Sequence, residues 1–501
     1  MRALVPSLLV LAACGGGHKY IASPSPMMAD QGAVAIASEP SSGETYAART
    51  DSPMREAAST PLSTFSIDVD TASLANVRRM LRDGHLPPAD AVRVEEMLNY
   101  YRYALPAPAP DAAIGLLAEV SASPYHPERR LIRLGLSTRP MDAGATPPRN
   151  LVFLIDTSGS MSAAGKLPLL RQALALLVER MRPVDRIALV VYAGAAGVVL
   201  ESTPGSDKER ILAALDRLEA GGSTNGGAGI EAAYAEAERG FDPRAVNRVI
   251  LASDGDFNVG TTDTAGLIDL IGKKRASGVY LTTLGVGDGN LSDANMEALA
   301  QHGNGNYHYL DSLGEARKVL VDDAAGTLVT LARDVKVQVE FDPAQVRAYR
   351  LVGYENRLLA DDDFRDDRVD AGEIGPGHQV TAVYEVEPAE GATGAALATL
   401  RVRYRLPDGA EPVELRLAVQ DAGAGPDAAS VDQRLTTALV GFAMLLRASP
   451  HAGAASWPLV HELARDSAGA DAQRLELVGM IERAAALAGQ PLAASHPRRA
   501  Q

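Results

Sequence analysis

Two carboxylates and three hydroxyls stand at positions where they could bind a metal ion together. Asp156, Ser158 and Ser160 alternate directly after an apolar run. Farther along, Thr224 adds a hydroxyl in a Gly-rich stretch, and Asp254 adds the second carboxylate. Such oxygen atoms are hard ligands that suit Mg²⁺, with Ca²⁺ or Mn²⁺ as alternatives. The favoured chemistry is therefore the binding of a divalent cation by oxygen alone.

Strands and helices are expected to alternate around these residues. Residues 151–155 form a continuous apolar run of the kind found in strands that are buried on both faces, and residues 247–252 also predict a buried strand. Helices are expected over 166–181 and 228–237, and this spacing predicts a doubly wound, mainly parallel α/β sheet. Ligands of such sheets bind beyond the carboxyl ends of the strands. Asp156 and its partners should therefore share one rim.

Each acidic residue also has an interpretation without metal. Asp156 precedes an expected helix and could cap it, and Asp254 could be a turn residue. Asp256 is either a plain loop acid or a side chain that tunes the site from outside the ligand set. The metal interpretation rests on three segments of one sheet supplying the same kind of atom.

These residues resemble the von Willebrand factor A domain and its metal-ion-dependent adhesion site, over about 150–330. The resemblance implies a Rossmann-like fold and a metal that recognises an acidic side chain of a protein partner. A weaker resemblance, carried by 61–70 and 352–357, is to bacterial lipoproteins in which two regions of poorly defined function flank this domain. The metal ligands that the resemblance implies are Asp156, Ser158, Ser160, Thr224 and Asp254.

The first residues predict a lipid anchor. A basic start and a short apolar run end in Leu-Ala-Ala before Cys14, the single cysteine of the chain. The run is too short to span a bilayer, which needs about 20 residues, but it suits a secretory signal. Its end resembles the bacterial lipobox, which implies lipidation of Cys14. Gly15 follows where Asp would favour the inner membrane, so the resemblance implies the outer membrane of a Gram-negative envelope. The alternative is an ordinary signal peptide.

The remaining chain divides by composition and periodicity. Strands expected near 116–123 and 130–137 and after 330 could form one antiparallel β-sandwich that the metal domain interrupts. We expect a signal peptide (1–13), a disordered tether (14–60), an N-terminal helical region (61–110), strands that join the sandwich (111–145), the von Willebrand factor A domain (146–330), the rest of the sandwich (331–425) and C-terminal helices (430–490).

Composition and failed motifs exclude several functions. The net charge of -15 argues against nucleic acid as a partner. Lys166 suggests a P-loop, but the spacing from Gly159 is one residue too long, and Leu167 replaces the required Ser or Thr. Asn290 stands where a dinucleotide loop needs a third Gly. Arg465 stands where a zinc helix needs a second His.

The sequence therefore predicts a binding protein and no enzyme. We expect it on the bacterial envelope, anchored through Cys14, with a protein partner that offers an acidic side chain to the metal. Two alternatives stay open. One is a metal-dependent hydrolase, against which the absence of a positioned general base counts. The other is an envelope scaffold in which the metal only stabilises loops.

Overall fold

The computed structural model describes residues 43–142, 144–222, 226–255, 264–393, 396–407, 409 and 411–492. Internal contacts divide the chain into residues 1–39 and residues 40–501, and the fold below belongs to the second unit. Cys14 lies outside the described residues. Among the residues described, no helix combines the length and the apolar character needed to cross a bilayer.

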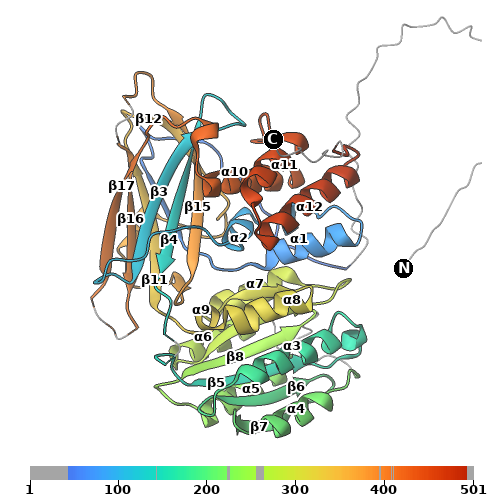
Figure 1. Ribbon diagram of the computed structural model, residues 1–501. Coiled ribbons are helices and arrows are strands. Elements are labelled where there is room, and N and C mark those ends of the chain that lie inside the picture. Colours follow the sequence, from blue (N-terminus) through green and yellow to red (C-terminus); the bar gives the residue numbers. More distant parts are fainter. Residues whose placement is uncertain are drawn as a thin grey trace, which may run out of the picture. The chain divides into compact units, whose positions relative to one another are not determined.

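The central domain contains a six-stranded sheet in the order β10-β9-β8-β5-β6-β7 (Figure 1). All neighbouring strands are parallel except β7, which pairs antiparallel with β6 at the edge. The expected doubly wound, mainly parallel sheet is therefore confirmed. Its strands are β5 (Arg149–Asp156), β6 (Arg186–Tyr192), β7 (Ala196–Pro204), β8 (Val246–Ser253), β9 (Tyr280–Val286) and β10 (Tyr307–Leu310).

Helices cover both faces of this sheet (Figure 1). Along β5, Phe153 joins a core with Leu170 of one helix layer, and Leu154 joins a separate core with Tyr234 of the other. A strand buried on both faces explains the continuous apolar run. The helices are α3 (Leu167–Arg180), α4 (Lys208–Asp216), α5 (Gly226–Arg239), α6 (Thr264–Ala276), α7 (Asp293–His302), α8 (Leu313–Arg317) and α9 (Ala324–Leu328).

The last helix of this domain differs from expectation. The sequence predicts one helix over 313–330, but a π-helical turn at Lys318–Asp322 separates α8 from α9. Lys318 in this turn donates a hydrogen bond to the Tyr100 carbonyl, outside the domain. Local periodicity carries no information about such a contact.

Two antiparallel sheets form the expected sandwich, in the orders β1-β12-β15-β4-β3 and β13-β2-β11-β16-β17. The chain leaves the first sheet after β4, builds the central domain and returns at β11, so the interrupted arrangement is confirmed. The strands are β1 (Arg55–Glu56), β2 (Leu62–Ser66), β3 (Ile114–Ala122), β4 (Arg130–Thr138), β11 (Ala332–Phe341), β12 (Val346–Val352), β13 (Leu358–Leu359), β14 (Gly372–Ile374), β15 (Gln379–Pro388), β16 (Ala396–Arg405) and β17 (Val413–Gln420).

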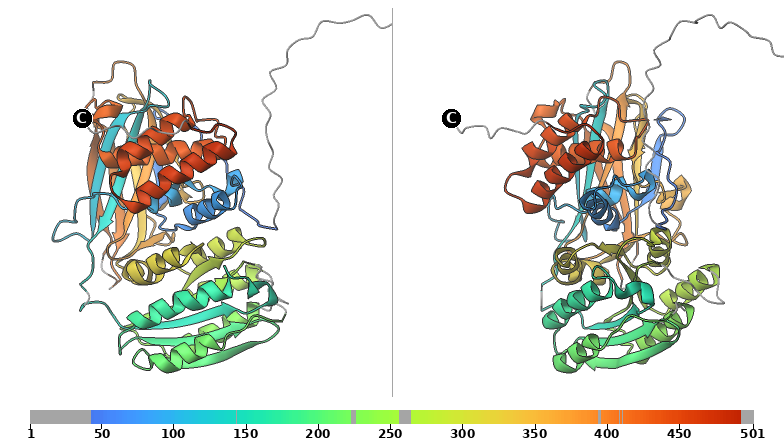
Figure 2. Two further views of the ribbon diagram at one scale, coloured as in Figure 1. Left: turned by 45° about the vertical axis from the view of Figure 1, so that its right-hand side comes forward. Right: turned by 90° about the vertical axis from the view of Figure 1, so that its right-hand side faces the viewer.

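The N-terminal and C-terminal helices form one helical layer (Figure 2). Met97 of α2, Leu439 of α10 and Ile481 of α12 belong to the same core, which also takes in Leu131 and Val383 from the sandwich. Sequence segments that were expected to be separate therefore share one interior. The helices are α1 (Ala72–Arg82), α2 (Val94–Asn99), α10 (Val431–Leu446), α11 (Trp457–Ala468) and α12 (Ala472–Leu487).

The expected disordered tether is wrong for its last part, residues 43–60. The backbone N–H of Thr45 donates to Leu291 (2.9 Å), and Arg49 forms an ion pair with Glu297 (2.7 Å). Downstream, β1 pairs with β12 of the sandwich. The composition of this segment is that of a linker. Its order comes from contacts with partners far away in the sequence, which composition does not reveal.

Candidate metal site

Asp156 is the last residue of β5, and three neighbouring segments hold its carboxylate. Oδ1 accepts the backbone N–H of Ser158 (2.8 Å), while Oδ2 accepts the hydroxyls of Tyr192 (3.2 Å) and Ser253 (3.1 Å). The residue is fully buried, and this burial raises its pKa. Since the neighbours come from β6 and β8, the carboxylate stands at the central rim of the sheet.

Ser158, Ser160 and Asp254 continue this group of oxygen atoms. The hydroxyl oxygens of Ser158 and Ser160 are 3.0 Å apart, and Ser160 donates to Asp254 Oδ2 at 2.7 Å. Asp254 directly follows β8 and is buried, whereas Ser160 is exposed. The structure thus brings together four predicted ligands and leaves them open to solvent at Ser160. Thr224 lies outside the described residues.

This set of donors fits a hard divalent cation. Its members offer carboxylate and hydroxyl oxygens, which are the ligands that Mg²⁺, Mn²⁺ and Ca²⁺ prefer. The charge of Asp254 also contributes to the raised pKa of Asp156, so the two carboxylates interact electrostatically. A cation between them would relieve this repulsion. The group also lies where doubly wound sheets bind ligands, at the carboxyl end of the strand at which the strand order reverses, here β5.

Two residues that the sequence analysis did not predict, Lys166 and Asn290, also contact the site. Lys166 donates to Asp254 Oδ2 (3.0 Å) and to the side-chain oxygen of Asn290 (2.8 Å), and Asn290 donates to the same carboxylate oxygen (3.1 Å). Burial opposes ionisation of Asp254, but hydrogen bonds from Ser160, Lys166 and Asn290 outweigh it and lower the pKa. The sequence relates both residues only to nucleotide-binding loops, because nothing in the spacing connects them to Asp254.

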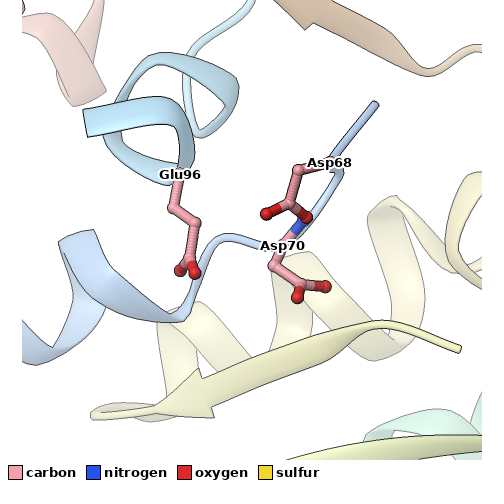
Figure 3. Close-up of side chains that lie close together, drawn as sticks. All are labelled: Asp68, Asp70 and Glu96. Carbon is pink, nitrogen blue, oxygen red and sulfur yellow. The ribbon is translucent and has the colours of Figure 1, made fainter. Parts of the chain in front are cut away.

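A second group of carboxylates lies outside the central sheet. Asp68, Asp70 and Glu96 are buried, and each contributes an oxygen that lies within 4.8 Å of the others (Figure 3). Arg357 donates to Asp68 (3.2 Å) and Asp70 (3.4 Å), and Arg93 forms an ion pair with Glu96. The sequence analysis assigns no role to these acids, two of which follow β2, which ends at Ser66.

Comparison with known proteins now identifies the chain. The von Willebrand factor type A domain family matches residues 150–321, and a family described as von Willebrand factor matches 40–133. A third family, described as "Uncharacterized protein YfbK, C-terminal", matches 326–395 and 388–487. "Uncharacterized protein YfbK" of Escherichia coli (strain K12) is 41% identical over 460 residues, or 86% of this chain and 79% of that protein. The chain belongs to the YfbK family. The expected resemblance to von Willebrand factor A proteins is confirmed.

More distant relatives of this YfbK-family chain match smaller parts. "Uncharacterized protein sll0103" of Synechocystis is 29% identical over 190 residues, which is 38% of this chain and 44% of that protein. A solved structure, the von Willebrand factor type A protein from Catenulispora acidiphila, is 14% identical. It covers 73% of this chain and 89% of its own, with a TM-score of 0.45.

Proposed function

We propose that this chain binds a protein partner on the bacterial envelope through a divalent cation, Mg²⁺ in the first instance. The central observation is the chain of oxygen atoms from buried Asp156 to exposed Ser160 at the rim of the sheet. A cation there would present an open coordination position to solvent. An acidic side chain of the partner would fill it. The cation would be held by Asp156, Ser158, Ser160, Thr224 and Asp254.

The surroundings of the two carboxylates support binding without hydrolysis. The described contacts of Asp156 come from Ser and Tyr hydroxyls and a backbone N–H. Those of Asp254 include a Ser hydroxyl, an ammonium and an amide. A hydrolase would need a group placed to take a proton from metal-bound water. We therefore propose a non-enzymatic role.

The test combines metal binding with recognition of acidic side chains. Full-length protein is presented with a library of Glu-containing peptides, with Mg²⁺ or with chelator, and each enriched peptide is compared with its Gln counterpart. We expect peptide enrichment to require both Mg²⁺ and the Glu carboxylate. The substitution Asp156→Asn should abolish this enrichment. Asp242→Asn, at an exposed loop ion pair with Arg244, is the matched control. Equal capture of Gln peptides would contradict the proposal.

The membrane attachment is a separate part of this proposal, and it rests on the sequence around Cys14. We infer that Cys14 carries lipid and that the protein resides at the outer membrane. Cys14→Ser should release the protein from the membrane fraction and leave Mg²⁺-induced thermal stabilisation intact. A wild-type protein that is wholly soluble in the periplasm would contradict the anchor and leave the metal site untouched.

A further inference from the structure

Lys166 is a buried cation next to a predicted metal ligand. It directly precedes α3, and its backbone is fixed there because its N–H donates to Ala163 and its carbonyl accepts from Leu170, both at 2.9 Å. The side chain is 6% exposed and forms an ion pair with Asp254 at 3.0 Å. Burying an ammonium group is costly unless it is paired, so this contact is a defined part of the site.

The loop after β9 provides the space for this side chain. Gly287 has φ +75°, and a Cβ atom at this position would lie 2.3 Å from the methylene groups of Lys166. The Gly287 carbonyl accepts the buried hydroxyl of Tyr309, which fixes the loop beside the lysine. Farther along the loop, Asn290 accepts a second N–H of the ammonium group. The absence of a side chain at Gly287 therefore leaves space for Lys166, and the ammonium group donates to Asp254 and Asn290.

The lysine changes the charge of the metal site. Asp156 and Asp254 together carry two negative charges, and the ammonium group of Lys166 cancels one of them. A divalent cation would then leave the site with one positive charge, where without the lysine it would be neutral. Since Coulomb interactions between groups a few ångströms apart are strong in a buried site, the lysine should weaken cation binding. It should also make the loaded site more attractive to a carboxylate.

We propose that Lys166 is an internal counter-ion that holds the metal affinity low until an acidic ligand supplies the missing negative charge. This inference rests on the proposed function of the same site and specifies its regulation. Without a partner, Lys166 competes with the cation for Asp254. With a partner, the carboxylate of the ligand and the cation stabilise each other.

The first experiment measures Mn²⁺ binding to the full chain without any partner. Lys166→Met keeps much of the apolar stem and removes the charge, so the Kd for Mn²⁺ should fall roughly 10- to 100-fold by the Coulomb argument. Lys273→Met removes an exposed lysine that pairs with Asp269 within α6, and it should leave the Kd unchanged within about twofold. An unchanged or higher Kd in Lys166→Met would overturn the proposal. If that variant does not fold, Lys166→Gln replaces it.

The second experiment adds acetate as a carboxylate probe, with chloride at the same ionic strength as the reference. Acetate should lower the apparent Kd for Mn²⁺ of the wild-type chain and have a smaller effect on Lys166→Met. An equal effect on both chains would overturn the coupling. If acetate affects neither chain but Lys166→Met still binds Mn²⁺ more tightly, the counter-ion role stands, while the coupling and the proposed recognition of acidic partners both fail.

Discussion

Two groups of buried carboxylates differ in how their charge is balanced. At the rim of the central sheet, hydroxyl and amide groups contact Asp156 and Asp254, and one lysine contacts Asp254. In the second group, Glu96 contacts Arg93 at the start of its own helix, and Asp68 and Asp70 contact Arg357 from a distant segment. The comparison teaches that proximity of carboxylates does not define a metal site. We expect the kind of countercharge and the access to solvent to determine whether a group of carboxylates binds a cation.

The second group joins the central domain to its flanking regions. Arg93 of the N-terminal region bridges Glu96 to Asp293 at the start of α7. Asp70 accepts the backbone N–H of Tyr307 on β10 (2.7 Å). Arginine suits this role because its planar fork binds two carboxylates and stays charged. The geometry is that of a structural connection between the central domain and the rest of the unit.

Protons complete the charge balance of this connection. Counting Glu95, Asp293 and Glu297 with the three acids gives six carboxylates, against the three guanidinium groups of Arg49, Arg93 and Arg357. Burial raises the pKa of Glu96 to about 8 in spite of Arg93, and it raises the pKa of Asp70 well above its ordinary value. Protonation of Glu96 and Asp70 thus reduces the excess negative charge.

The largest expected effect is the loss of Arg93. Arg93→Ala would leave the buried carboxylates of Glu96 and Asp293 without their shared partner, and removing one side of a buried ion pair costs about 3–5 kcal/mol. Urea unfolding should show this loss. Arg244→Ala, at an exposed pair with Asp242, should change stability by less than about 1 kcal/mol. Equal stability of the two variants would show that the connection is not structural.

A smaller effect should separate the two site carboxylates in metal-free protein. Asp254→Asn removes the ion-pair partner of buried Lys166 and should cost about 1.5–3 kcal/mol, as for a hydrogen bond to a charged group. Asp156→Asn should cost less, because it leaves the ion pair between Lys166 and Asp254 in place and removes only one oxygen acceptor from the contacts of Asp156. Thermal unfolding with chelator measures both variants. Similar destabilisation by the two would contradict the role assigned to Lys166.

The sequence predicted the parts of the site that depend on local pattern. The apolar runs gave the sheet, and the position of Asp156 and Asp254 after two of its strands placed both acids at one rim. Lys166 and Asn290 were not predictable as site residues, because their contact requires the loop after β9 to fold over the start of α3. The same holds for Arg93 and Asp293, which are 200 residues apart in the chain.

The pH dependence of stability should distinguish the second group. Glutamate titrates near 4.5 when unfolded and Glu96 near 8 when folded, so between these values the folded chain holds a proton that the unfolded chain has lost. The stabilising contribution is full below pH 4.5 and disappears as the pH rises to 8, by at most about 1.4 kcal/mol per pH unit.

Glu96→Gln should therefore flatten the decline of unfolding free energy between pH 4.5 and 8. Glu231→Gln, at an exposed position on α5, should reproduce the wild-type profile. Urea unfolding at half-unit pH steps gives the comparison. A Glu96→Gln profile that is parallel to wild type throughout this window would show that Glu96 is ionised in the folded protein.

The smallest expected effect concerns metal binding at the second group. Asp70→Asn removes a carboxylate that is already paired with Arg357 and whose pKa is raised by burial, so the Kd for Mn²⁺ should stay within about twofold of wild type. Asp156→Asn should abolish binding in the same titration, because it removes a charged ligand from the sheet rim. If Asp70→Asn lost Mn²⁺ binding and Asp156→Asn kept it, the cation would belong to Asp68, Asp70 and Glu96. Arginine pairing would then be compatible with a metal site in this chain.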